Sequence, residues 1–194
     1  MSSNIDDSIP PFGAATTAGV RSNFNHAKIE ITNLQDATGF VNYQDTATAT
    51  TPISVPSGTW TNLTNNKLGS LTVNKLPGSI DLWNSSTNRF SFSGLPLYTQ
   101  LTGRFDIEVT TGGNNMDVDV RALVAIGTAS EYPFPLMTQM RFATAGTHQV
   151  NIFNGMYLGS NDVRTAPASL QIRTSGTATV KVNGWYLTIQ KPTF

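Results

Sequence analysis

GRFDIEVTTGGNNMDVDVRALVAIG, residues 103–127, is the stretch that decides the fold. Apolar and charged residues alternate from Phe105 to Val109 and again from Met116 to Arg121. Strand residues that are two positions apart share a face, so each segment predicts a strand with one buried and one solvated face. Between them, GGNN (112–115) is rich in residues that favour turns. The stretch therefore predicts two half-buried strands joined by a turn.

Similar short segments, rich in β-branched and aromatic residues, recur along the chain. Turn-forming residues separate them and no segment of helix length lies between them, which argues against parallel βαβ units. The expected strands are residues 40–44, 51–55, 59–64, 79–84, 89–94, 103–111, 116–127, 137–143, 148–159, 168–174 and 178–190. The pattern predicts a mainly β fold, an antiparallel jelly-roll or β-sandwich domain. Residues 122–126 and 185–187 are apolar on both faces, which predicts cover by another sheet or by a neighbouring subunit.

One helix is expected ahead of the β region, in VRSNFNHAKIEITNLQ (20–35). Its apolar positions follow the four-three alternation of a heptad seam. These candidate oligomerisation residues are Val20, Phe24, Ala27, Ile31 and Leu34, whereas Ile29 lies off the seam. Two interpretations stay open: an ordinary amphipathic helix packed on its own domain, or a short parallel bundle held by a narrow seam.

The start of the chain predicts an extended arm over residues 1–16, because Ile9-Pro10-Pro11 and Gly13 disfavour regular structure. We expect two parts: an N-terminal anchoring arm and helix (1–38) and a β-sandwich knob domain (39–194). The first residues lack the basic cluster and apolar segment of a secretory signal. No apolar run approaches the length of a membrane span, so membrane insertion is not expected.

Charged residues make up only 12% of the chain, about half the usual share, and the formal net charge is zero. Nucleic acid and anionic membranes are poor candidate partners, because both select for clustered lysine and arginine. Threonine and asparagine supply much of the polarity instead. The absence of cysteine removes disulfides, thiolate metal sites and cysteine nucleophiles.

Residues that could carry chemistry are few. The two histidines, His26 and His148, share no local motif with an acid or a serine, and no nucleotide-binding, hydrolase or metalloprotease motif occurs. Two acidic pairs have the residue types of glycosidase carboxylates or calcium ligands, but equally those of any solvated strand face: Asp106 with Glu108, and Asp117 with Asp119. Several aromatic residues are candidate sugar-stacking platforms or core residues: Trp60, Trp83, Tyr98, Tyr132 and Tyr157. We assign no catalytic, cofactor-binding or metal residue and expect neither a cofactor nor enzyme activity.

Three segments carry a resemblance: LWNSSTNRFSFSGLPLYTQLTGRFDIEVTT (82–111), ALVAIGTASEYPF (122–134) and VKVNGWYLTIQ (180–190). They resemble small β-rich domains of tailed-bacteriophage tail fibres and related virion proteins. The beginning, IPPFGAATTAGVRSNFNHAKIEITNLQ (9–35), is similar to the N-terminal segments of many phage fibre and appendage proteins.

This resemblance implies a homotrimer of jelly-roll knobs, similar to the tumour-necrosis-factor-like knobs of viral fibres, with the arm docked to other virion proteins. The expected function is that of a structural virion protein, assembled in the host cytoplasm and exposed on the particle, with a host-surface glycan as a candidate partner. The bundle leads almost directly to the knob without a shaft. A head fibre or a capsid decoration protein is therefore the alternative, and a carbohydrate-active enzyme using the acidic pairs is the third interpretation.

Overall fold

The structure is a computed structural model that describes residues 17–192, apart from the side chains of residue 17 and residues 33–35. The arm predicted for residues 1–16 lies outside the described residues. The elements are α1 (Thr17–Gln35), β1 (Thr38–Gln44), α2 (Ala47–Thr50), β2 (Ile53–Val55), β3 (Thr61–Asn62), β4 (Val73–Asn74), the 3-10 helix η1 (Pro77–Ser79), β5 (Trp83–Asn84), β6 (Arg89–Phe90), β7 (Gln100–Thr111), β8 (Met116–Val124), β9 (Tyr132–Phe142), β10 (Gly146–Tyr157), α3 (Asn161–Thr165), β11 (Ser169–Thr174) and β12 (Ala178–Gln190).

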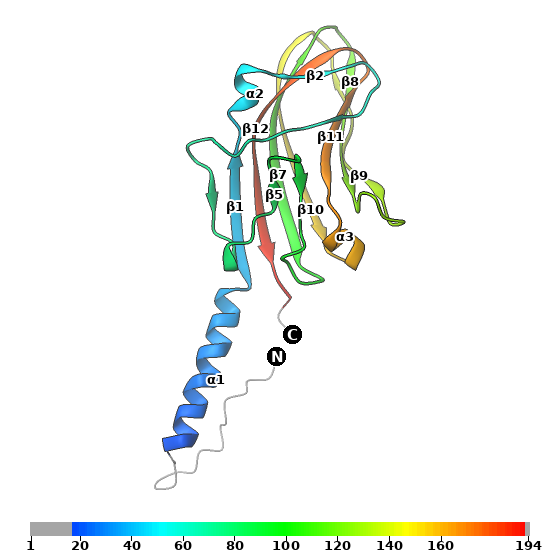
Figure 1. Cartoon of the computed structure of the whole chain (residues 1–194). Coiled ribbons are helices and arrows are strands. Elements are labelled where there is room, and N and C mark those ends of the chain that lie inside the picture. The colour runs from blue at the N-terminus through cyan, green and yellow to red at the C-terminus, as the bar shows by residue number, and fades with distance from the viewer. Residues whose placement is uncertain (1–16, 193–194) are drawn as a thin grey trace.

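Two large antiparallel sheets form the body of the β domain (Figure 1), and β5 and β6 pair in a separate two-stranded sheet. The first has the order β10-β7-β12-β1-β4, with β2 also paired to β12, and the second has the order β3-β11-β8-β9. Among the strands β1, β3 and β7 to β12, the first pairs with the last (β1–β12), the second with the seventh (β3–β11), the third with the sixth (β7–β10) and the fourth with the fifth (β8–β9). This nested pairing over two sheets is the jelly roll, and it confirms the predicted fold class.

The core fills the space between the two sheets. The alternation that predicted β7 and β8 is present, because every second residue of both strands is buried. At the centre lie Trp83 and Trp185, both fully buried, with ring centroids 5.9 Å apart in an edge-to-face arrangement. Phe90 and Phe105 complete this aromatic cluster. Such pairs add about 0.5–1.5 kcal/mol each to the free energy gained by burial.

A polar network anchors the long connection between β3 and β7 to the first sheet. The Tyr43 hydroxyl on β1 donates to Asp81 Oδ1 (2.8 Å) and accepts from the buried Leu82 N–H (3.0 Å). Lys67 Nζ forms an ion pair with Asp81 and donates to the Trp83 carbonyl. Burial alone would raise the pKa of Asp81, but hydrogen bonds from Lys67 and Tyr43 outweigh it, and the pKa is below its usual value.

Residues 56–99 contain less regular strand than the sequence predicted. Only Thr61–Asn62 of 59–64, Trp83–Asn84 of 79–84 and Arg89–Phe90 of 89–94 are strands, and η1 precedes β5. Side-chain hydrogen bonds replace ladder bonds here: the Asn65 amide donates to the Tyr43 carbonyl, for example. β4, α2 and α3 were not predicted.

The structure corrects the start of one predicted strand at the sheet edge, and it places the two segments that were predicted to be covered on both faces. β9 begins at Tyr132 rather than at residue 137, because prolines are tolerated in an edge strand that pairs on one side only. Within residues 185–187 of β12, Trp185 and Leu187 join the core, whereas Tyr186 is half-buried on the outer face, where no described segment covers it completely. Cover of that outer face by a neighbouring subunit stays a prediction. Ala122 and Val124 are buried, but Leu123 between them is half-buried.

The predicted N-terminal helix is present as α1, which extends away from the β domain at the end where β1 begins (Figure 1). Only two residues separate Gln35, the end of α1, from Thr38, the start of β1. None of the described helices is long and apolar enough to cross a membrane.

Candidate assembly surface

The heptad seam of α1 faces solvent in the single chain. The exposed fraction is 38% for Val20, 72% for Phe24 and 55% for Ile31, while Ala27 is half-buried. Leu34 belongs to α1, but its side chain lies outside the described residues. No other described helix or strand runs alongside α1 in Figure 1. The four described seam side chains therefore form an apolar stripe without a partner among the described residues, and such stripes mark interaction surfaces.

A second exposed apolar region begins where α1 ends and lies on the outer face of the first sheet. Phe40 on β1 packs against Tyr186 on β12, with ring centroids 5.9 Å apart, and the guanidinium of Arg104 on β7 lies 5.9 Å from the Tyr186 ring. On the edge strand β10, Phe153 and Tyr157 are 68% and 63% exposed. Sequence analysis marked residues 185–187 for cover by another sheet or a neighbouring subunit, but it did not join them to Phe40 and Phe153. Alternation alone does not say which outward aromatic residues share one end of a sheet.

The strand register explains this clustering. Tyr186 pairs with Arg104, which in turn pairs with Phe153, so the three side chains occupy one row across β12, β7 and β10. The aromatic row therefore lies toward the end of the domain from which α1 extends (Figure 1).

The acidic pairs are not brought together. Asp106 and Glu108 lie on β7 in the first sheet, whereas Asp117 and Asp119 lie on β8 in the second. Three of the four pair with arginines, Asp106 with Arg104 (2.9 Å), Asp117 with Arg141 (2.9 Å) and Asp119 with Arg173 (2.8 Å), and Glu108 accepts from Gln149. Within residues 17–192 no group of three histidine, aspartate or glutamate residues is placed to hold a metal.

Asp119 lacks the property of a general acid. Burial raises the pKa of Asp119, but hydrogen bonds from the Gln139 N–H and from Arg173 outweigh burial, so the pKa is lower than usual. A general acid needs a raised pKa in order to hold its proton near neutral pH.

The histidines and the candidate aromatic residues do not form one site. His26 lies on α1, whereas His148 lies on β10 and stacks on Phe142 with ring centroids 4.0 Å apart. Trp83 belongs to the core. Tyr98, Tyr132 and Tyr157 are exposed, and half-buried Trp60 contacts the guanidinium groups of Arg121 and Arg173.

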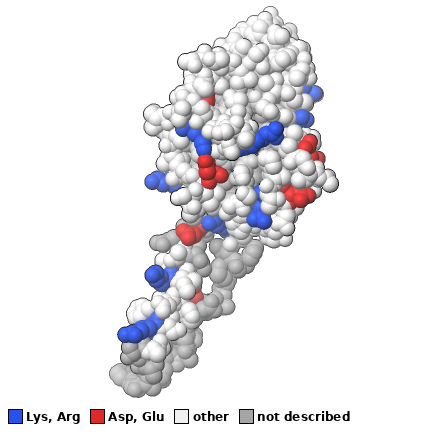
Figure 2. Space-filling model, viewed as in Figure 1, with Lys and Arg blue, Asp and Glu red and all other residues white. Residues whose placement is uncertain are grey.

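The surface of the β domain is poor in charge. In Figure 2 the visible charged side chains gather over the middle of the domain and along α1, and the end farthest from α1 is almost free of them. The electrostatic footprint of a nucleic-acid-binding protein, a continuous basic patch, is not seen on this face.

The chain is similar to known proteins only at the level of solved structures. No protein-family model and no curated protein matches the chain. Among solved structures, the chain is similar to one from the infectious bursal disease virus Gx strain (8% identity, TM-score 0.44, 81% of this chain and 32% of that chain). It is also similar to Eiger TNF from S. frugiperda (6% identity, TM-score 0.44, 81% of this chain and 95% of that chain). A third similar structure is the PRD1 vertex protein P5 (15% identity, TM-score 0.40, 80% of this chain and 73% of that chain).

This chain thus spans about a third of the length of the infectious bursal disease virus chain. At TM-scores of 0.40–0.44 these likenesses carry no argument for fold or function. The jelly-roll assignment rests on the nested strand pairing of this chain itself.

Proposed function

We propose that the chain is a structural protein of a tailed-bacteriophage virion, a trimeric fibre-like knob exposed on the particle. The observation that carries the proposal is the apolar stripe of α1, which stands outside the jelly roll with Phe24 and Ile31 more than half exposed. A solvent-exposed helix with such a stripe needs a partner, because helices in proteins gain most of their stability from packing an apolar face rather than from helix propensity.

The partner that fits the stripe is a second and a third copy of α1. The four-three spacing is that of a coiled-coil seam, and the aromatic surface around Phe40 and Tyr186 adjoins the same end of the domain. A parallel bundle of three α1 helices places three jelly rolls at one end of a common axis. The number three comes from the resemblance to trimeric fibre knobs.

A knob of this kind acts through avidity. Three identical domains on one axis reach a host surface together, and the effective concentration of the second and third contacts compensates for weak single-site binding. No chemical reaction belongs to this function, and the proposal includes no catalytic residue.

A second candidate is a capsid decoration protein that stabilises the head. The observation that favours it is the two-residue connection between Gln35 and Thr38, which leaves no shaft between the helix and the knob. Such a protein stabilises the shell by mass action, because it binds only the assembled lattice.

Light scattering on purified full chain tests the trimer. We expect a mass of three times 20.9 kDa for the natural sequence. The double variant Phe24→Asp/Ile31→Asp should lose the trimer, because it places unpaired charges in the seam. Ile29→Asp is the matched control, since Ile29 is 57% exposed on the same helix but lies off the seam. An unchanged mass in the double variant, or equal dissociation of both variants, would show that the seam does not hold the oligomer.

Immunogold labelling of purified particles, with an antibody against residues 40–194, tests the place on the virion. Label at the tail or at a few head positions supports the fibre-like knob. Dense label over the whole head supports the decoration protein instead, and particles without label contradict both.

A further inference from the structure

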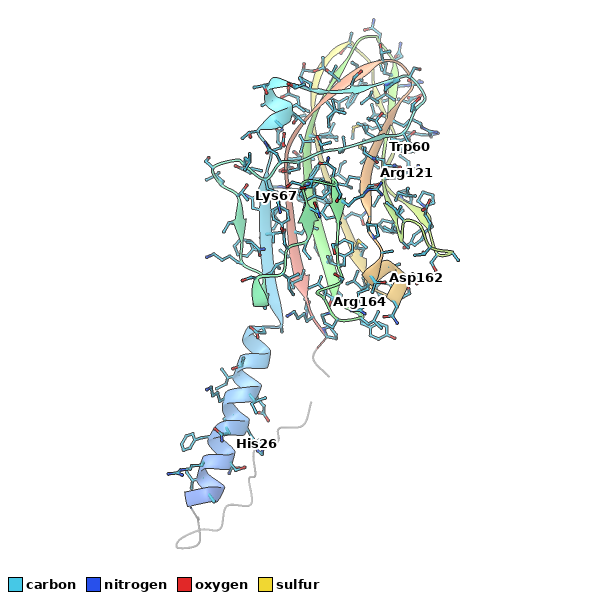
Figure 3. All side chains as sticks on the ribbon, in the orientation of Figure 1. His26, Trp60, Lys67, Arg121, Asp162 and Arg164 are labelled. Atoms are coloured by element: carbon cyan, nitrogen blue, oxygen red, sulfur yellow. The ribbon has the colours of Figure 1, made fainter. Side chains whose placement is uncertain are left out.

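An arginine-tryptophan cluster lies on the outer face of the second sheet, away from the assembly surface. It consists of Trp60, just before β3, Arg173 on β11 and Arg121 on β8. The guanidinium carbons of Arg121 and Arg173 lie 4.0 and 4.8 Å from the centroid of the Trp60 ring. Figure 3 shows Trp60 and Arg121 beside each other on this side of the domain. All three side chains are half-buried rather than fully covered.

The two arginines differ in how their charge is balanced. Arg173 is paired with Asp119 Oδ2 at 2.8 Å, and the other oxygen of Asp119 accepts the Gln139 N–H at 2.8 Å. Arg121 donates through Nε to Gln171 Oε1 at 2.8 Å, and its two terminal nitrogens make no hydrogen bond or ion pair with any residue between 17 and 192. One guanidinium in the cluster is therefore left without a counter-charge.

The unbalanced charge is held in place. The Trp60 ring contacts the Arg121 guanidinium, and Gln171 fixes Nε while its own amide donates to Asn62 Oδ1 at 3.0 Å. Burial and the positive charge of Arg173 lower the pKa of Arg121, so an anion placed here relieves an existing repulsion. A guanidinium with its Nε occupied and its terminal nitrogens open presents a fork that matches a carboxylate.

We propose that this cluster, Trp60, Arg121 and Arg173 with Asn62 and Gln171, binds a carboxylate-bearing sugar unit of an acidic glycan. The carboxylate bridges the terminal nitrogens of Arg121, and the Asn62 amide N–H groups, which donate to no described residue, meet a sugar hydroxyl. A single carboxylate matches the single unbalanced arginine, whereas a phosphate chain calls for several clustered cations. The inference gives the exposed knob of the proposed function a ligand class.

An NMR titration tests the site: sugars are added to the isotope-labelled full chain, and the indole N–H signal of Trp60 is followed. Of the three tryptophans, Trp83 and Trp185 are fully buried, so Trp60 alone reports on the surface. The probes are sodium galacturonate oligomers, galactose oligomers as sugar without the carboxylate, and sodium acetate as carboxylate without the sugar. We expect a saturable shift with the galacturonate oligomers and a much weaker response to the other two.

The variant Arg121→Gln should weaken galacturonate binding by about ten- to a hundredfold, because a charge-assisted hydrogen-bonded pair is lost. The matched control is Arg141→Gln, since Arg141 lies on the same sheet but is committed to Asp117. Thermal melting of both variants confirms that each is folded. Equal binding by natural chain and Arg121→Gln, an equal response to galactose or acetate, or no shift with galacturonate would each overturn the proposal. The indole signal is read independently of particle mass, so a failed glycan site and a failed trimer are distinguishable.

Discussion

Replacing Tyr43 by phenylalanine tests whether the polar network of the β3–β7 connection stabilises the domain. The substitution removes one hydroxyl and leaves the ring, so it creates almost no cavity. The lost hydroxyl donates to Asp81 and accepts from the buried Leu82 N–H. A hydrogen bond to a charged group contributes about 1.5–3 kcal/mol, and an orphaned buried N–H costs about 1–3 kcal/mol. Since Asp81 is 52% exposed and partly screened by solvent, we expect a loss of about 2–4 kcal/mol.

For a chain of this length that loss lowers the melting temperature by about 5–15 °C. Differential scanning calorimetry at pH 7 measures it. Tyr157→Phe is the control, because Tyr157 is 63% exposed and its hydroxyl makes no hydrogen bond with any described residue. Burial and the hydrogen bond to Asp81 raise the pKa of Tyr43, so its hydroxyl keeps its proton throughout the neutral range. A change within about 0.5 kcal/mol of that in Tyr157→Phe would refute the structural role of the network.

Two further predictions concern the same region. Asp81→Asn should destabilise the fold by about 1–2 kcal/mol at pH 7. The pKa of Asp81 is lower in the folded state than in the unfolded state, so Asp81 stabilises the fold above its unfolded pKa, near 4, and this stabilisation is lost as the pH falls through the folded pKa. Urea unfolding should therefore give similar free energies of unfolding for the natural chain and Asp81→Asn in acid. A difference between the two that stays constant with pH would contradict this. Gly184→Ala should cost about 1–3 kcal/mol, because its new Cβ would lie 2.8 Å from the Tyr43 carbonyl oxygen. Gly155→Ala, whose Cβ would meet nothing closer than 3.8 Å, should melt nearly as the natural chain does.

The sequence predicted the fold best where burial alone decides the local pattern. β7 and β8 alternate cleanly because one face packs on the core and the other meets solvent. The connection from residue 56 to residue 99 was predicted poorly, because side chains distant in sequence hold its backbone. The predicted strand 137–143 lacks the first residues of β9, because Pro133 and Pro135 are unfavourable in most strands. They are tolerated in β9 because it lies at the edge of its sheet.

The candidate sites divide in the same way. The stripe of α1 could be predicted, since all its members lie on one helix and their spacing is local. The arginine-tryptophan cluster could not, because Trp60, Arg121 and Arg173 come from three separate strand regions. They meet only through the register that pairs β3 and β8 with β11.

The short joint between α1 and β1 has a geometric consequence. The Asp36 N–H donates to the Thr32 carbonyl and the Lys191 N–H donates to the Ala37 carbonyl, so the two intervening residues are tied to the helix on one side and to the end of β12 on the other. The joint therefore fixes the rotation of the β domain about the axis of α1, so the direction in which the seam faces sets the direction in which both sheets face. One inserted residue would turn the domain by about 100° relative to the seam. In the proposed bundle, the joint would thereby determine which side of each jelly roll looks inward, toward its neighbours, and which looks outward.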